Sequence, residues 1–124
     1  LIQGENNVKE ERYEKEKRKI IQKEHQSGNE FNGLLRYLSD KTKGSIHDNG
    51  TINITSNSIN DSSCHPKNLV DYQSNELNYY QSKGDTSDAY VCFDFKNLRV
   101  QPTSYSIKSF SCSQNDWHLK SWVI

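Results

Sequence analysis

Residues 5–26 are rich in charged side chains and poor in apolar ones. Most of them are Glu, Lys, Arg and Gln, which are good helix formers. The large apolar side chains in this stretch are Val8, Tyr13, Ile20 and Ile21. A coiled-coil seam needs apolar positions in every heptad, which is more than this stretch supplies. The pattern predicts a charged, solvated helical linker over residues 1–28. The alternative is a coiled-coil helix that contacts the rest of a parent chain.

A second pattern, at residues 29–44, has the period of an amphipathic helix. Its apolar positions recur at i, i+3, i+4 and i+7, at Phe31, Leu34, Leu35 and Leu38. We expect Asn29 to cap the N-terminus of this short helix. Lys43 and Gly44 suit its C-terminus, where a cation complements the helix dipole and glycine adopts a positive φ. The apolar face predicts that the helix packs against residues 45–124.

From residue 45 onward the pattern changes to the two-residue period of β-strands, separated by loops rich in Ser, Thr, Asn and Asp. Residues 51–55 alternate after the turn dipeptide Asn49-Gly50. Residues 89–95 alternate with Val91, Phe93 and Phe95 on one face and Tyr90, Cys92 and Asp94 on the other. Further strands are predicted at residues 78–81, 100–110 and 122–124. Several short strands with no helix between them predict a mainly β protein with an antiparallel sandwich.

Composition and charge narrow the class of protein. Only 31% of the 124 residues are hydrophobic, so the core is smaller than the chain length allows. Sixteen basic and 16 acidic residues balance to a formal net charge of zero at pH 7, which argues against nucleic acid or an anionic membrane as a partner. No run of about 18 apolar residues is present, so the sequence predicts no membrane-spanning helix.

The three cysteines, Cys64, Cys92 and Cys112, are widely and irregularly spaced. An odd number at such spacing is typical of reduced thiols rather than of a disulfide framework. The N-terminus also lacks the apolar segment of a signal peptide. These features predict a cytoplasmic protein. The alternative is an extracellular or cell-surface protein whose leader lies outside this sequence, because the chain begins at Leu1 without Met.

Five short motifs follow one another through residues 45–124. They are Ile54–Ser58, Pro66–Asp71, Ala89–Phe95, Val100–Ser109 with its Tyr105-Ser106-Ile107 core, and Trp117–Ile124. In this order they resemble the coagulation factor V/VIII type C domain, also called the discoidin or galactose-binding-like domain. The lead-in resembles that of protist proteins, some of which carry an upstream BTB domain. The resemblance implies a discoidin-like jelly-roll β-sandwich that is C-terminally truncated, because the chain ends within the predicted strand at 122–124.

A sandwich of this type presents variable loops at one end of its strands. The loops expected to bind are residues 57–65, 79–88 and 111–117. Their candidate ligand-binding residues are His65, Tyr80, Asp85, Asp88 and Trp117. Trp117 lies between Asp116 and His118, where an exposed indole can stack on a sugar or anchor a protein partner. The alternative is that its indole folds back onto the sandwich. Trp122, by contrast, lies in a strand pattern and is expected in the core.

Asn68 and Asp71 lie three residues apart in a predicted turn. Their side chains are suited to accept backbone N–H groups and lock the loop. Some members of the resembled family bind Ca²⁺ near this turn, but Tyr72 stands where the family has glycine. We therefore expect a structural turn and no cofactor, and the alternative is a Ca²⁺ site at this turn. A zinc site is not expected either, because the residues with suitable side chains lack paired spacing. Those residues are Cys64, His65, Cys92, Cys112 and His118.

Catalytic patterns are missing from the sequence. No nucleophile is followed by a base and an orienting group at a recognisable spacing, and the Gly-x-Ser-x-Gly elbow is absent. We therefore expect a non-catalytic module of a larger protein that binds a ligand or a protein. The alternative is a carbohydrate-binding appendage of a secreted or surface protein or of a hydrolase.

Overall fold

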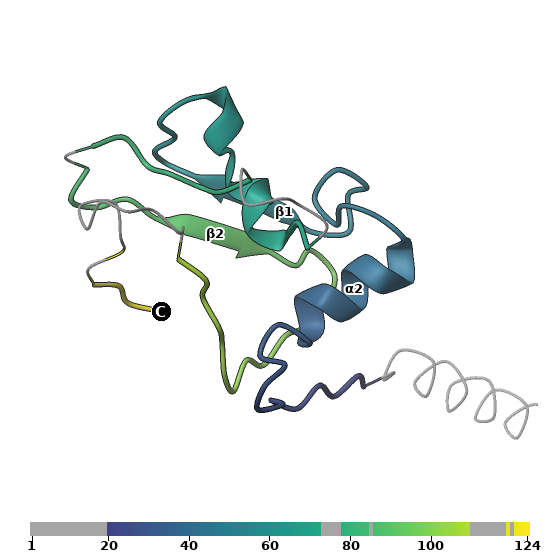
Figure 1. Cartoon of the computed structure of the whole chain (residues 1–124). Coiled ribbons are helices and arrows are strands. Elements are labelled where there is room, and N and C mark those ends of the chain that lie inside the picture. Colours follow the sequence, from purple (N-terminus) through teal and green to yellow (C-terminus); the bar gives the residue numbers. More distant parts are fainter. Residues whose placement is uncertain (1–19, 73–77, 85, 110–118, 120) are drawn as a thin grey trace, which may run out of the picture.

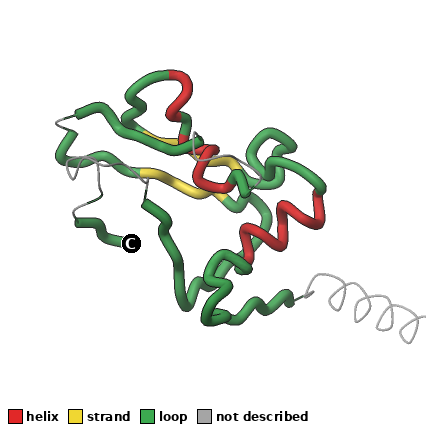
Figure 2. Tube along the Cα trace, viewed as in Figure 1, coloured by secondary structure: helices red, strands yellow, loops and turns green. Residues whose placement is uncertain are grey.

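The computed structural model describes residues 20–72, 78–84, 86–109, 119 and 121–124 (Figure 1). The elements in chain order are helix α2 (Leu34–Thr42), strand β1 (Asn53–Ser56), the short 3₁₀ helices η1 (Ser62–Cys64) and η2 (Pro66–Val70), and strand β2 (Val91–Asp94). Figure 2 shows that loops make up most of the rest of the described chain.

The two strands form one antiparallel pair, in which Asn53 lies opposite Asp94 and Ser56 lies opposite Val91. Each strand follows the alternation of its sequence. In β1 the side chain of Ile54 is buried between exposed neighbours, and in β2 Val91 and Phe93 are half-buried while Cys92 and Asp94 are exposed. The strands predicted within residues 51–55 and 89–95 are therefore confirmed, together with the faces of the second.

Helix α2 confirms the predicted amphipathic helix but begins later than expected. Its N-cap is Gly33, which makes no side-chain cap hydrogen bond, so the prediction that Asn29 caps the helix is wrong. Residues 26–32 instead form two turns, closed by hydrogen bonds from Asn29 N–H to the Gln26 carbonyl and from Asn32 N–H to the Asn29 carbonyl. Phe31 consequently lies outside the helix and is 41% exposed.

The C-terminus of α2 also differs from the prediction. Lys43, not Gly44, adopts the left-handed conformation, with φ of 55°. The N–H groups of Lys43 and Gly44 both donate to the carbonyl of Ser39, and the Ser39 hydroxyl donates back to the Gly44 carbonyl at 3.0 Å. These bonds satisfy the end of the helix in a geometry that glycine adopts more readily than lysine.

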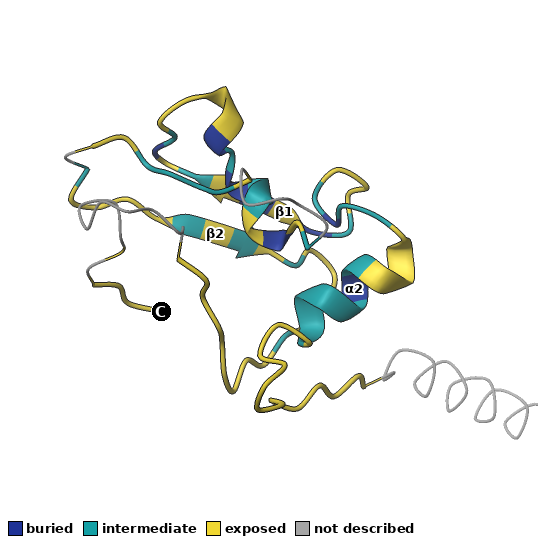
Figure 3. Ribbon diagram, viewed as in Figure 1, coloured by how far each residue is buried: buried dark blue, intermediate teal, exposed yellow. Residues whose placement is uncertain are grey.

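The core lies where α2 meets the strand pair (Figure 3). It consists of the buried side chains of Leu38, Ile46, Ile52, Ile54 and Val70. Partly buried apolar side chains surround this cluster, among them Leu34 and Leu35 from α2 and Phe93 and Phe95 from β2 and its end. The helix therefore packs against the segment that follows it, as its apolar face predicts.

The predicted N-terminal helix is wrong over its last residues, because residues 20–26 are irregular and exposed. Residues 5–19 of that prediction lie outside the described residues. Three further predicted strands are not found in the described chain, at residues 78–81, 100–109 and 122–124. Residues 101–109 are all exposed and include Pro102, which has no N–H to donate to a ladder.

Trp122 is 50% exposed, so its predicted place in the core is wrong. Its indole Nε1–H donates to the hydroxyl of Tyr105 at 2.9 Å, and Tyr105 is itself 59% exposed. Residues 121–124 form no strand and are all exposed. Because they do not pair with another strand of the described chain, the alternation in their sequence does not bury one face. The two aromatic side chains instead join two extended segments on the surface.

Candidate ligand-binding loops

Two of the three predicted loops, residues 57–65 and 79–88, lie side by side in the described structure. Asn60 N–H donates to the Gln81 carbonyl at 2.9 Å. The Tyr80 hydroxyl donates to the Ser58 carbonyl at 2.9 Å, which crosses from one loop to the other. Isolated hydrogen bonds thus hold the segment 78–81 against the other loop. The segment does not form the strand that its sequence predicts.

Ser58 is the buried centre of this loop pair, with only 8% of its surface exposed. Its Oγ accepts the Lys83 N–H at 3.0 Å and lies 3.2 Å from Thr86 Oγ1. Because the Thr86 hydroxyl donates to the Lys83 carbonyl at 3.1 Å, the Ser58 hydroxyl is the donor in the bond to Thr86. One serine hydroxyl therefore satisfies both ends of the turn at residues 83–86.

Asn57 joins the loop pair to the sheet. In the β1–β2 register the next facing pair after Ser56 and Val91 is Asn57 and Tyr90. Here the Asn57 side chain takes the place of a peptide group. Its Nδ2 donates to the Asp88 carbonyl at 3.1 Å, and its Oδ1 accepts the Tyr90 N–H at 2.9 Å. The ladder is thereby extended by a side-chain amide, and the main chain turns away into the loop.

A hollow of about 410 Å³, here called the loop hollow, opens between the two loops. Its lining residues are Ser56, Asn57, Ser58, Ile59, Lys83 and Thr86. Five of these six described lining residues have polar side chains, and the sixth is Ile59. Polar side chains of this kind can donate hydrogen bonds to and accept them from a polar ligand, and none of the described lining residues is an Asp, Glu, His or Cys.

The predicted site residues divide between the loop pair and other positions. Tyr80 supports the loop hollow from behind through its bond to Ser58, and the Asp88 carbonyl anchors Asn57. His65 lies between η1 and η2, where its Nδ1 accepts the Lys67 N–H at 3.0 Å, and it does not line the loop hollow. Asp85 and Trp117 lie outside the described residues.

The predicted turn at Asn68 and Asp71 is the end of η2, in which Asn68 lies within the 3₁₀ helix and Asp71 is its C-cap. The Asn68 amide donates to the carbonyls of Ser63 at 2.8 Å and Tyr79 at 3.0 Å, so Asn68 ties both predicted loops together. Asn68 therefore holds the loops as a hydrogen-bond donor, whereas the sequence pattern predicts that its side chain accepts backbone N–H groups. The Asp71 carboxylate accepts the side-chain amide of Asn78 at 3.0 Å. Within the described residues, no group of three or more His, Cys, Asp or Glu side chains is placed to hold a metal ion.

Sequence reasoning missed the residues that shape this region most directly, namely Ser58, Lys83 and Thr86. It also missed Asp61, which caps η1 by accepting the Ser63 N–H at 2.8 Å. The hydrogen bond from the Ser63 hydroxyl is the main reason that the pKa of Asp61 lies below its ordinary value. The Asp-Ser-Ser sequence at residues 61–63 is a typical local cap signal and was sufficient to find this residue.

Comparison of the chain with profiles of known protein families, with curated proteins and with solved structures finds no match. Interpretation of the loop hollow therefore depends on its geometry. A search of the described helices finds none with the length and apolar character needed to cross a membrane.

Proposed function

We propose that this protein is a non-catalytic binding module of the discoidin type and that the loop hollow binds a carbohydrate. The proposal includes the fold, in which the β1–β2 pair belongs to a jelly-roll sandwich. The observation that carries it is the lining of the hollow, in which five of the six described residues have polar side chains and the sixth is Ile59. Sugars offer hydroxyl groups that act as donor and acceptor at once, and they complement such a lining.

The loop hollow is also preorganised for binding. Ser58 is buried and its hydroxyl bonds fix Lys83 and Thr86, and the Asn57 amide fixes the opposite side through Asp88 and Tyr90. A ligand that enters the hollow therefore meets the side chains of Ser58, Thr86 and Asn57 in conformations that are already fixed. None of the described lining residues is aromatic, so we expect the affinity to come from hydrogen bonds, and a Kd on the order of millimolar is expected from a few of them.

Saturation-transfer NMR with monosaccharides, followed by titration of the best binder, tests this function. We expect Lys83→Ala to weaken binding by about fivefold, the factor produced by the loss of one ordinary hydrogen bond. Lys108→Ala is the matched control, because Lys108 is an exposed lysine that does not line the hollow. Absence of transfer from any sugar, or equal weakening in both variants, would contradict the proposal.

A protein partner is the second candidate, and the exposed pair of Tyr105 and Trp122 favours it. Tyrosine and tryptophan are enriched at the centres of protein interfaces, and the bond between these two fixes their relative position before binding. In this case the module acts as a cytoplasmic adaptor. A photo-crosslinker placed at Ile107, an exposed side chain close in sequence to Tyr105, should capture one defined protein. Tyr105→Ala should abolish that capture if the pair forms the interface, and unchanged capture would exclude it.

A further inference from the structure

His47 and His65 face each other in the described structure although they are 18 positions apart in the sequence. Their ring centroids are 5.3 Å apart and the rings are tilted by 55°. His47 belongs to the loop between α2 and β1, and His65 belongs to the junction between η1 and η2. Both side chains are partly buried. The pair therefore joins two loops at the edge of the core.

Each imidazole accepts a hydrogen bond from a backbone N–H through Nδ1. Ile54 N–H donates to His47 Nδ1 at 3.1 Å, and Lys67 N–H donates to His65 Nδ1 at 3.0 Å. A nitrogen that accepts an N–H carries no proton of its own, so both rings are neutral and hold their single proton on Nε2. A second proton on either ring can bind only at Nδ1. It turns this nitrogen from a hydrogen-bond acceptor into a donor, which then faces the backbone N–H.

The bond to His47 protects the core strand. Ile54 is 1% exposed, and its N–H lies on the side of β1 away from β2. On the same side, Ile52 N–H donates to the Ile46 carbonyl at 3.0 Å. The loop at residues 45–50 thus covers the outer edge of β1 through one backbone bond and one imidazole bond. Loss of the imidazole bond uncovers part of a strand edge.

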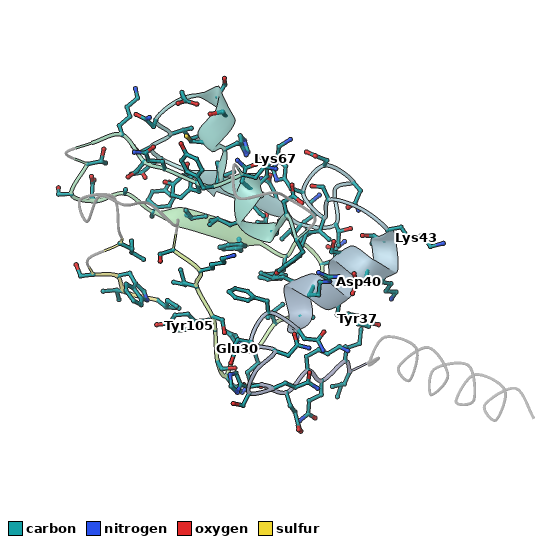
Figure 4. The ribbon with its side chains drawn as sticks, viewed as in Figure 1. Glu30, Tyr37, Asp40, Lys43, Lys67 and Tyr105 are labelled. Atoms are coloured by element: carbon teal, nitrogen blue, oxygen red, sulfur yellow. The ribbon has the colours of Figure 1, made fainter. Side chains whose placement is uncertain are left out.

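The charged groups near the pair shift the pKa of His65 in opposite directions. Lys67, on η2, forms an ion pair with Asp48 at 3.1 Å, and Figure 4 labels this lysine. Burial is the first cause that lowers the pKa of His65, followed by the neighbouring His47 and Lys67, while Asp48 raises it. From the β2 end, Lys96 donates its ammonium to the Gly50 carbonyl and adds a further positive charge to this loop. The two members of the Lys67–Asp48 ion pair therefore oppose each other in their effect on the pKa of His65.

We propose that His47 and His65 form an acid-sensitive latch, in which a proton at Nδ1 breaks the backbone hydrogen bond that this nitrogen accepts. At His47 this releases the loop at residues 45–50 from the edge of β1, and at His65 it releases the first turn of η2. The proton comes from solvent, and no other bond is made or broken. Because folding lowers the pKa of His65 from its ordinary 6.5, its contribution to stability is fully present above that pH and is lost as the pH falls through the folded value. The latch is independent of any ligand of the loop hollow.

Amide hydrogen exchange of the whole chain, measured by NMR at about pH 7 and about pH 5, tests the latch. Protection factors are compared, since they remove the intrinsic pH dependence of exchange. We expect the Ile54 and Lys67 amides to lose about fivefold in protection at the lower pH, the effect of one lost hydrogen bond. The Tyr37 amide, which donates to the Gly33 carbonyl in α2, should keep its protection. Unchanged protection at Ile54 and Lys67 would overturn the proposal.

The variant that carries both His47→Asn and His65→Asn replaces each Nδ1 by an amide oxygen that accepts the same N–H and does not titrate. It should keep high protection at both pH values, whereas His25→Asn, at an exposed position, should leave the pH response intact. A double variant with the full pH response would overturn the latch. Imidazole ¹⁵N shifts of the unaltered protein give a second readout that needs no substitution, because a protonated Nδ1 in either ring at about pH 7 would also overturn it.

Discussion

Replacement of Ile54 by alanine tests whether the small core described above holds the fold together. Ile54 is 1% exposed and packs within the core cluster that joins β1 to α2 and η2. The substitution removes three buried carbon atoms, worth about 2.4 kcal/mol at roughly 0.8 kcal/mol each. The cavity left behind raises the expected loss of unfolding free energy into the range of about 2–5 kcal/mol.

Urea unfolding followed by far-ultraviolet circular dichroism measures this loss, as a change in midpoint at constant slope. Thr55→Ala is the matched control, because Thr55 is the next residue of the same strand and its side chain is exposed. That control should cost less than about 1 kcal/mol, the span of strand propensity. A loss below about 1 kcal/mol for Ile54→Ala, or equal losses in both variants, would refute the placement of the core.

Three further predictions concern single positions. Lys43→Gly should raise the unfolding free energy by up to about 1 kcal/mol in the same urea assay, because φ of 55° is strained for lysine and ordinary for glycine. Trp122→Ala should cost less than about 1 kcal/mol, and a loss of 3 kcal/mol or more, the roughly expected cost for a core tryptophan, would show that its indole is buried. Asp61→Asn should change the pH dependence of stability only in acid, below about pH 3.8. Because folding lowers the pKa of Asp61 from 3.8, its contribution to stability is present above pH 3.8 and is lost as the pH falls through the folded pKa. Thermal unfolding measured over a series of acid pH values tests this change.

The sequence predicted the elements whose pattern is local. The alternation through Ile54 and through Val91 and Phe93 identified both strands and the face that each buries, because a two-residue period is determined by the backbone itself. The period of Leu34, Leu35 and Leu38 likewise identified α2. Phe31 fits the same period, yet it lies outside the helix, since residues 26–32 form two turns and the helix begins only at Leu34.

Features that depend on distant partners were not predictable from pattern. Ser58 is one of many serines in this chain, and its burial follows from bonds to Lys83 and Thr86, which lie more than twenty positions later. Trp122 has the alternation of a strand but no neighbouring strand in the described chain, so its pattern gives no burial. The role of a polar residue such as Ser58 depends on which distant segments fold against it. The period of the hydrophobic residues does not contain that information.

One chemical group, the side-chain amide of Asn57, holds the end of the β1–β2 pair together next to Ser56 and Val91. The amide has a donor group, Nδ2, and an acceptor atom, Oδ1, and these bond to the Asp88 carbonyl and the Tyr90 N–H, respectively. Hydrolysis of that amide to a carboxylate, the ordinary chemical ageing of asparagine, removes the donor and places a negative charge against a carbonyl oxygen. Spontaneous deamidation at this position would therefore loosen residues 88–90 from β1 without any change in the encoded sequence.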